Sequence, residues 1–366
     1  MDAMYVHIPF CVKKCLYCDF NSYADTSLES QYIDALVEEI NSFKEKRLKT
    51  IFVGGGTPTI LSYKNLETLL KTLKGFSVQE FSIECNPGTI EMDKLLLMKK
   101  YGVNRLSIGL QAWQDSLLKK LGRIHTLYDF LKSYTAARDA GFENINVDLM
   151  FDIPGQTLQD WKETIENVEA LKPEHISCYS LIIEEGTPFY SMWEKDMLVI
   201  PDEEEDRRMY YYAVQKLKEH GYRQYEISNF AKPGFECRHN IVYWKTKEYA
   251  GVGAGAHSYV DGCRYSNLSG VAEYIDGIRN GNAIDNKNVV TKKESMEEFM
   301  FLGLRMMEGV SKSCFQERFN VSMEEVYGKQ LEKFISLKLL YDDGEMVRLT
   351  PRGIDVSDRI FEEFML

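Results

Sequence analysis

Short apolar runs alternate with helical patterns along the first half of the chain. Six runs of strand-like composition predict β-strands, at residues 5–8, 50–53, 80–85, 104–110, 144–151 and 175–183. In residues 27–43, apolar residues fall on one helical face: Leu28, Tyr32, Ile33, Leu36, Val37, Ile40 and Phe43. Strands that alternate with helices predict an α/β fold with a parallel sheet covered by helices.

Polar or glycine-rich groups follow five successive predicted strands. The first strand leads into a cysteine loop, and the second into Gly54–Pro58. The third ends in Glu84–Pro87, the fourth ends next to Gln111, and the fifth carries Asp148. Alternation alone fits either an open doubly wound sheet or a barrel. Because α/β barrels build their sites at the carboxyl ends of the strands, these groups favour a complete or partial barrel.

The pattern changes from about residue 202. An acidic-fronted helix is predicted over residues 201–221, followed by the block CRHNIVYW at 237–244. The polar stretch 280–288 lacks apolar periodicity and predicts a linker. We therefore expect two domains, a barrel with its extension in residues 1–285 and a second domain in residues 286–366.

The second domain is expected to be small and mainly helical. Helical patterns at residues 296–307, 323–340 and 353–365 accompany one short strand at 345–350. This order is similar to that of a winged helix. Its Lys and Arg residues are balanced by Glu and Asp, so we do not expect it to bind DNA. We expect it to dock on the barrel.

Composition limits the classes of protein to consider. The 366 residues are 44% hydrophobic and 27% charged, as in globular proteins with a sizeable core. The net charge of -12 and the lack of a basic block disfavour a nucleic-acid partner. The N-terminus has no signal-peptide pattern and no apolar run has transmembrane length, which predicts a cytoplasmic protein with at most peripheral membrane contact.

Three of the eight cysteines are clustered, at Cys11, Cys15 and Cys18. A structural zinc site would need a fourth ligand, for which His7 is a candidate, although a hydrogen-bonded histidine is the simpler interpretation. Four thiolates would saturate a 4Fe-4S cluster, whereas three leave one iron open for an exchangeable ligand. The spacing C-x3-C-x2-C therefore favours an iron-sulfur cluster.

This spacing resembles the signature of the radical S-adenosylmethionine superfamily. The resemblance implies that S-adenosylmethionine binds the open iron and is cleaved reductively. Tyr17, before the last cysteine, fits the same pattern. So does GGGTP at residues 54–58, where glycine allows the close approach of backbone and ligand.

Further segments narrow the resemblance to the HemN/HemW branch: YVHIPFC, SIECNP, RLSIGLQ followed by LGRIH, and NVDLMFDIPGQT. Membership would imply a partial (β/α)6 barrel, similar to a TIM barrel, and a HemN-type C-terminal domain. By this resemblance, S-adenosylmethionine is held by Tyr5, Gly55, Glu84, Gln111, Arg123 and Asp148. Three further positions match contacts to a second S-adenosylmethionine molecule in the dehydrogenase of this branch: Tyr17, Gly56 and Thr57.

The block at 237–244 contains an HNxxYW motif that resembles the heme-associated sequence of HemW-type proteins. It implies a heme site formed by His239, Asn240, Tyr243 and Trp244. His239 offers an imidazole for iron and the aromatic pair offers flat apolar faces. Cys237 is an alternative axial ligand. Without the resemblance, an aromatic pair beside a histidine is more simply interpreted as core.

Two functions follow from the resemblance. The dehydrogenase motif continues past the third cysteine with Gly-Cys, but here these positions are Asp19 and Phe20. That difference favours a HemW-type heme chaperone that delivers heme to respiratory apoproteins. The alternative is an oxygen-independent coproporphyrinogen III oxidase of porphyrin biosynthesis. Flavodoxin or ferredoxin is the kind of electron donor that either would use, and homodimerisation stays open.

Overall fold

A parallel sheet forms the centre of the molecule, as predicted. The computed structural model describes residues 1–366. Its parallel strands follow one another in sheet order as in sequence: β1 (Ala3–Ile8), β2 (Thr50–Gly55), β3 (Glu80–Cys85), β4 (Arg105–Gln111), β5 (Ile145–Phe151) and β6 (His175–Ser180). All six predicted strands are confirmed. The sixth ends before residue 183 because Ser180 is the register partner of Phe151, the last residue of β5.

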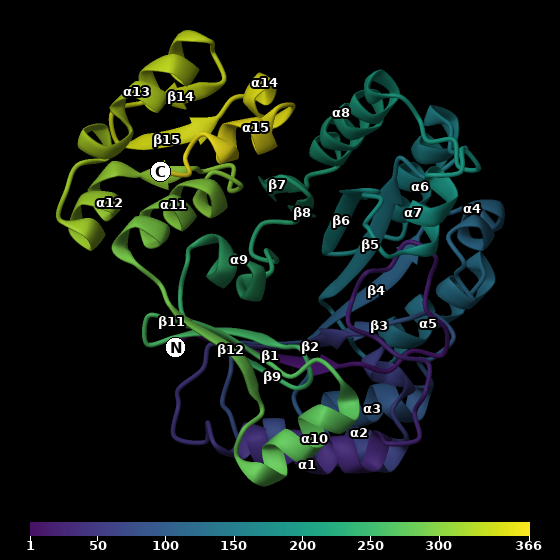
Figure 1. Ribbon diagram of the computed structural model, residues 1–366. Helices are drawn as coiled ribbons and strands as arrows, with labels where there is room; N and C mark the ends of the chain where they lie inside the picture. Colours follow the sequence, from purple (N-terminus) through teal and green to yellow (C-terminus); the bar gives the residue numbers. More distant parts are fainter.

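Helices connect these strands and cover the outer face of the sheet (Figure 1). They are α1 (Glu29–Asn41), α2 (Tyr63–Leu73), α3 (Met92–Lys100), α4 (Asp115–Lys120), α5 (Leu127–Asp139) and α6 (Leu158–Ala170), with the 3-10 turn η1 (Pro58–Ile60) after β2. The predicted apolar face of α1 is confirmed, since Tyr32, Ile33, Leu36 and Ile40 are buried. The inner face of the sheet is left for the functional site.

Additional strands extend the sheet at both edges. Beside β1 lie β9 (Tyr249–Val252), β10 (His257–Val260), β11 (Cys263–Asn267) and β12 (Ile284–Val289), and beside β6 lie β8 (Asn229–Ala231) and β7 (Arg223–Glu226). The two outermost strands, β12 and β7, do not pair with each other. The sheet is therefore a partial barrel, which confirms the predicted fold class.

The predicted linker at residues 280–288 is wrong. Residues 284–289 form β12, an antiparallel partner of β11 in the main sheet. All six residues of β12 are exposed, so the strand has no apolar side for a sequence pattern to reveal. Backbone hydrogen bonding to β11 forms this strand.

Four helices accompany the extension: α7 (Pro188–Trp193), α8 (Glu203–Glu219), α9 (Arg238–Trp244) and α10 (Val271–Asn280). The predicted acidic-fronted helix is α8, and its N-cap Asp202 accepts a hydrogen bond from the backbone of Glu205. Helix α9 carries the HNxxYW motif and lies on the concave side of the sheet (Figure 1). None of the helices combines the length and the apolar character that crossing a bilayer requires.

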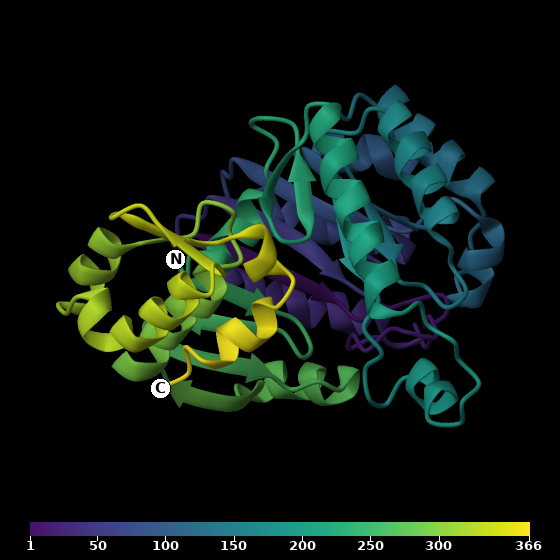
Figure 2. The same ribbon diagram turned by 90° about the horizontal axis from the view of Figure 1, so that it is seen from above.

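The C-terminal part has its own core and lies beside the barrel (Figure 2). It contains α11 (Lys292–Gly303), β13 (Val310–Ser311), α12 (Lys312–Phe319), α13 (Met323–Ser336), β14 (Leu340–Asp342), β15 (Met346–Leu349), α14 (Pro351–Ile354) and α15 (Ser357–Glu362). The three short strands form a separate sheet in the order β13-β15-β14. The sequence pattern misses α12, whose buried residues are only Phe315 and Phe319.

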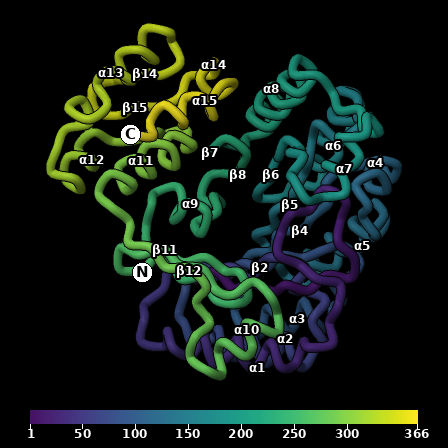
Figure 3. Tube along the Cα trace, viewed as in Figure 1, coloured from purple at the N-terminus to yellow at the C-terminus, as the bar shows by residue number.

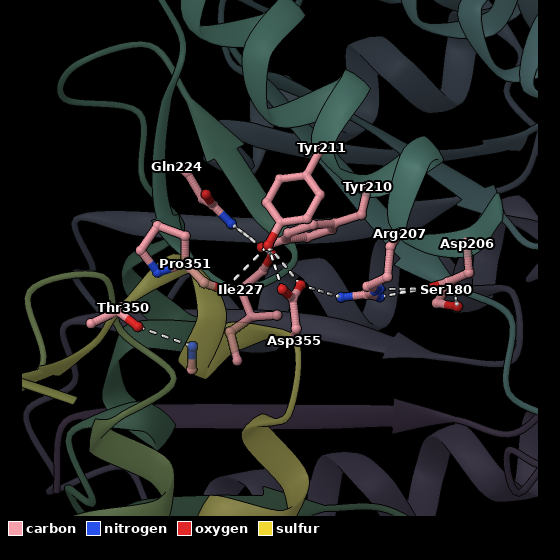
Figure 4. Close-up of polar contacts among 11 residues, drawn as sticks. Ser180, Asp206, Arg207, Tyr210, Tyr211, Gln224, Ile227, Thr350, Pro351 and Asp355 are labelled. Atoms are coloured by element: carbon pink, nitrogen blue, oxygen red, sulfur yellow. Dashed lines mark hydrogen bonds and ion pairs between the residues drawn. The ribbon is translucent and has the colours of Figure 1, made fainter. Parts of the chain in front are cut away.

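The C-terminal part docks on the barrel, as predicted, and α8 provides one set of contacts. Figure 4 shows the hydroxyl of Tyr211 in α8 directed at the carboxylate of Asp355, to which it donates at 2.7 Å. Arg207, one turn earlier, places Nη1 3.5 Å from Asp355 Oδ1 and also pairs with Asp206. Asp206 in turn accepts a hydrogen bond from Ser180, at the end of β6. This network joins the C-terminal part to the rim of the barrel.

Candidate functional site

The cysteine loop lies at the carboxyl ends of the barrel strands. It leaves β1, and Cys11 N donates to Tyr23 O at 2.9 Å across the base of the loop. Leu16 N donates to Leu121 O after α4, and Phe189 N of α7 donates to Leu16 O, both at 3.0 Å. In Figure 3 this purple loop runs beside the segments around α4 and α7. Backbone contacts with distant segments therefore fix the loop at the rim.

Cys11, Cys15 and Cys18 all line one cavity of about 330 Å³. Cys11 Sγ lies 3.6 Å from Thr57 Oγ1, and Arg123 Nη1 lies 3.7 Å from Cys15 Sγ. Burial raises the pKa of the Cys18 thiol, so binding a metal there must release a proton.

The donor set suits a cluster better than a single ion. No group of three or more His, Cys, Asp and Glu side chains is arranged to hold one metal ion. A cluster does not require such convergence, because each thiolate binds a different iron. His7 is engaged elsewhere, with Nδ1 3.0 Å from Tyr5 Oη and Nε2 2.8 Å from Asn21 O. The zinc alternative therefore lacks its candidate fourth ligand.

The glycine run at the end of β2 lies directly against β1 and the cysteine loop. A Cβ on Gly56 would stand 2.5 Å from Phe10 O and 3.0 Å from Cys11 Sγ. A Cβ on Gly55, where φ is +110°, would stand 2.5 Å from the ring of His7. Only glycine allows this close approach of β2, β1 and the cysteine loop.

Two half-buried carboxylates, Glu84 on β3 and Asp148 on β5, line the cavity on either side of β4. Glu84 Oε2 accepts a hydrogen bond from Gly55 N at 3.0 Å. Burial, and then the nearby Asp148, raise the pKa of Glu84 to about 8. The Asp148 carboxylate accepts hydrogen bonds from Ser107 at 2.9 Å and Asn146 at 2.8 Å. The two acids thus have different environments within one cavity.

Arg123 completes the polar wall next to the cysteines. Its Nη2 donates to Asn86 Oδ1 at 2.7 Å and to Gly109 O at 2.8 Å, while Nε has no partner. Asn86 also donates to Thr57 Oγ1 at 2.6 Å. Gln111 has a φ of 74° at the end of β4 and lines the same cavity. An unpaired buried donor and glycine-lined backbone are features that fit an anionic, amino-acid-like ligand.

The structure brings the predicted S-adenosylmethionine residues together. The cysteine cavity is lined by Tyr17, Gly55, Gly56, Thr57, Glu84, Gln111, Arg123 and Asp148. Tyr5 lines a second cavity, of about 570 Å³, deeper in the barrel. Phe20, 60% exposed, lines both cavities, as do Glu84 and Asp148. The two cavities are therefore neighbours with shared walls.

Three of the four predicted heme residues line the deeper cavity: His239, Asn240 and Tyr243. His239 is fully engaged, since Nδ1 lies 2.9 Å from Thr50 Oγ1 and Nε2 lies 2.7 Å from Tyr243 Oη. Burial, and then Arg105, lower the pKa of His239 to about 3, which keeps the imidazole neutral. Trp244 does not line this cavity; its ring packs under Arg305 at 4.7 Å.

Several cavity residues are absent from the sequence-based prediction. Asn86 belongs to a strand end that the sequence pattern marks as polar, but its link to Arg123 is a tertiary contact. The inner wall also includes Phe52, Arg105, Ser107, Asn146, Ser177 and Tyr179. A signal exists for Arg105, since a charged residue opens the apolar run of β4. The remaining residues of the inner wall can be identified only when it is known which side of each strand faces the barrel interior.

Comparisons with known proteins identify the family of the chain. Residues 5–168 match the Radical SAM superfamily model and residues 290–356 match the HemN C-terminal domain model. The chain is 43% identical over 376 residues to heme chaperone HemW of Bacillus subtilis (strain 168), covering 100% of this chain and 99% of that protein. It is 41% identical over 370 residues to heme chaperone HemW of Lactococcus lactis subsp. lactis (strain IL1403), covering 100% and 97%.

A solved structure shares the fold along the whole chain. Coproporphyrinogen III oxidase (HemN) from Escherichia coli, described as a radical SAM enzyme, superposes with a TM-score of 0.85 at 23% identity, covering 100% of this chain and 90% of that chain. At this identity the likeness concerns the fold. The similarity to the HemW proteins is higher and extends over the full chain. The chain therefore belongs to the HemW family within the radical S-adenosylmethionine superfamily.

Proposed function

We propose that this protein is a heme chaperone that binds heme and delivers it to respiratory apoproteins. The observation that carries the proposal is the full-length similarity, at 41% and 43% identity, to two proteins named heme chaperone. Phe20 supports it, because a cysteine stands at this position in the motif of the dehydrogenase branch. An electron donor of the flavodoxin or ferredoxin kind and a homodimer belong to the same proposal.

Membership of the superfamily implies a 4Fe-4S cluster and S-adenosylmethionine. We propose that Cys11, Cys15 and Cys18 hold the cluster. The residues proposed to bind S-adenosylmethionine are Tyr5, Tyr17, Gly55, Gly56, Thr57, Glu84, Gln111, Arg123 and Asp148. When bound, the two cofactors supply reductive cleavage of S-adenosylmethionine. The chain itself contributes Arg123 for a carboxylate and the glycine backbone for close approach.

We place heme in the deeper cavity, with His239, Asn240 and Tyr243 on its wall and Trp244 behind them. The volume of about 570 Å³ lies within the usual range for ligand pockets. His239 offers a neutral imidazole, the form that ligates iron. Its Nε2 must first release the hydroxyl of Tyr243, which lines the same cavity. Heme binding is thus expected to rearrange the His239–Tyr243 pair.

The test is a hemin titration of the anaerobically reconstituted full chain, followed by its visible spectrum. We expect stoichiometric binding that falls at least tenfold in affinity in His239→Ala. His257→Ala is the matched control, because His257 lines the same cavity but is exposed. Loss of binding in His257→Ala alone would assign the ligand to His257 instead. Protoporphyrinogen formation from coproporphyrinogen III would contradict the chaperone proposal and favour the oxidase.

We also propose the two domains predicted from the sequence, with the division after residue 285 moved to the end of β12. The first then contains the barrel, its extension and α9. The second is the HemN-type domain, whose family match begins at residue 290.

A further inference from the structure

Arg105 is a charged residue buried at the inner end of the deeper cavity. It opens strand β4 and is only 2% exposed. Its side chain lines the cavity together with Ser107, two residues later on the same face of the strand. Ser82 on β3 is its register partner. The strand therefore directs a guanidinium into the barrel interior.

This guanidinium has no partner within the chain. Arg105 forms no hydrogen bond or ion pair, and its Nε is a buried donor without an acceptor. The hydroxyl of Ser82 is also buried without a partner. Leaving a charged group buried and unpaired is costly, so such a group is expected to meet an anion in the functional state.

The nearest carboxylates are engaged by other groups. Glu80 Oε2 accepts from Arg238 N and Oε1 from His239 N, each at 3.0 Å, at the start of α9. Asp148 accepts from Ser107 and Asn146. These acids lower the cost of burying Arg105 at longer range but do not fill its hydrogen-bonding positions. The planar fork of an arginine pairs best with a carboxylate, which accepts two parallel hydrogen bonds.

The rest of the cavity wall indicates which carboxylate fits. Five aromatic side chains line the same cavity as Arg105: Tyr5, Phe52, Tyr179, Tyr243 and Tyr249. A ligand for this cavity has a flat apolar body and an acidic tail. Resting on the proposed heme binding, we infer that Arg105 is a specificity-determining residue that pairs with a propionate carboxylate of the bound tetrapyrrole.

The test compares hemin with hemin dimethyl ester, whose propionates are capped, on the full reconstituted chain in one solvent. We expect wild-type protein to bind hemin at least tenfold more tightly than the ester. In Arg105→Gln, hemin affinity should fall to that of the ester, and ester affinity should stay unchanged. Arg105→Lys, which keeps the charge without the fork, should fall between the two. Arg47→Gln is the matched control, because Arg47 is exposed and has no partner.

The outcomes separate this inference from the proposed function. If wild type binds neither compound, the proposed heme function fails and the inference with it. If wild type binds hemin and the ester equally, heme binding stands and the role of Arg105 is overturned, whatever the variants do. If Arg105→Gln weakens S-adenosylmethionine in equilibrium dialysis but leaves hemin unchanged, Arg105 serves the amino-acid carboxylate, which also overturns the inference.

Discussion

Glu84 on β3 and Asp148 on β5 show how two similar acids in one cavity acquire different properties. Asp148 accepts two side-chain hydrogen bonds, from Ser107 and Asn146, whereas Glu84 accepts one from the backbone of Gly55. Burial therefore dominates at Glu84 and raises its pKa to about 8. The protonated form is the stable one in the free protein at neutral pH. A cationic ligand such as S-adenosylmethionine would reverse that preference.

We predict that Glu84→Gln changes the pH dependence of the unfolding free energy. Between the ordinary pKa of 4.5 and about 8, folded Glu84 keeps a proton that the unfolded chain releases. Wild-type stability from this group therefore falls as pH rises, by up to about 1.4 kcal/mol per pH unit. The glutamine variant lacks that decline, so the difference in unfolding free energy should shift in its favour from pH 5 to pH 8. Urea unfolding across this range measures it, and a constant difference would contradict the prediction.

Helix α9 depends on one carboxylate at its N-terminus. Glu80, at the start of β3, accepts the backbone N–H groups of Arg238 and His239, and lies 3.6 Å from Cys237 Sγ. These N–H groups have no partner within the helix, and the negative charge also interacts favourably with the helix dipole. Because α9 carries His239 and Tyr243, Glu80 also fixes one wall of the deeper cavity.

We therefore predict that Glu80→Gln loosens α9. The variant removes the charge and one acceptor, which should lower the unfolding free energy by about 2 kcal/mol. Amide hydrogen exchange of residues 238–244 should accelerate, while exchange in β2 and β5 stays unchanged. Glu332→Gln, on the exposed face of α13, is the control and should change neither quantity. Unaltered exchange in α9 would show that packing, not the cap, holds the helix.

Several contacts join the C-terminal part to the barrel and its extension, including the ion pairs Arg264–Glu298 and Arg305–Glu226 and an apolar cluster that contains Met306. On α8, Tyr211 donates a hydrogen bond to Asp355 and Arg207 forms an ion pair with it. Asp206 links Arg207 to Ser180 at the rim of the barrel. Glu226 of β7 forms an isolated bridge with Met306. Because the C-terminal part has its own core, we expect it to stay folded when one of these polar contacts is removed.

We predict that Tyr211→Phe weakens this docking without affecting the cores. Removal of the hydroxyl leaves Asp355 with only the Arg207 contact, at a cost of about 1 kcal/mol at a partly exposed site. Hydrogen exchange should rise in residues 351–362 and stay constant in α13. Tyr341→Phe, an exposed tyrosine in β14, serves as the control. If residues 351–362 exchange at the same rate in Tyr211→Phe and Tyr341→Phe, the Tyr211–Asp355 hydrogen bond does not contribute to docking.

The sequence predicts the parallel strands and the rim of the site, because local periodicity and spacing encode them. The three cysteines and Gly54–Pro58 lie at or directly after the carboxyl ends of parallel strands. Their proximity in the structure therefore follows from the parallel topology alone. The interior wall does not follow in this way. His239 meets Thr50 across 189 residues, and β12 pairs through its backbone without an apolar pattern. Those features depend on the curvature of the sheet and on contacts between distant segments.

Strand β1 has a consequence for the order in which the protein matures. It is made first, but one of its two neighbours is β9, with Ala3 paired to Tyr249. In the cysteine loop, Asn21 Nδ2 donates to Ala254 O at 3.1 Å and to Ser269 O at 2.9 Å. During synthesis the three thiols therefore emerge early and are anchored late, after most of the chain has left the ribosome. Loading of iron and sulfide into a defined site thus belongs after residues 249–269 have been made, and until then the thiols are open to oxidation.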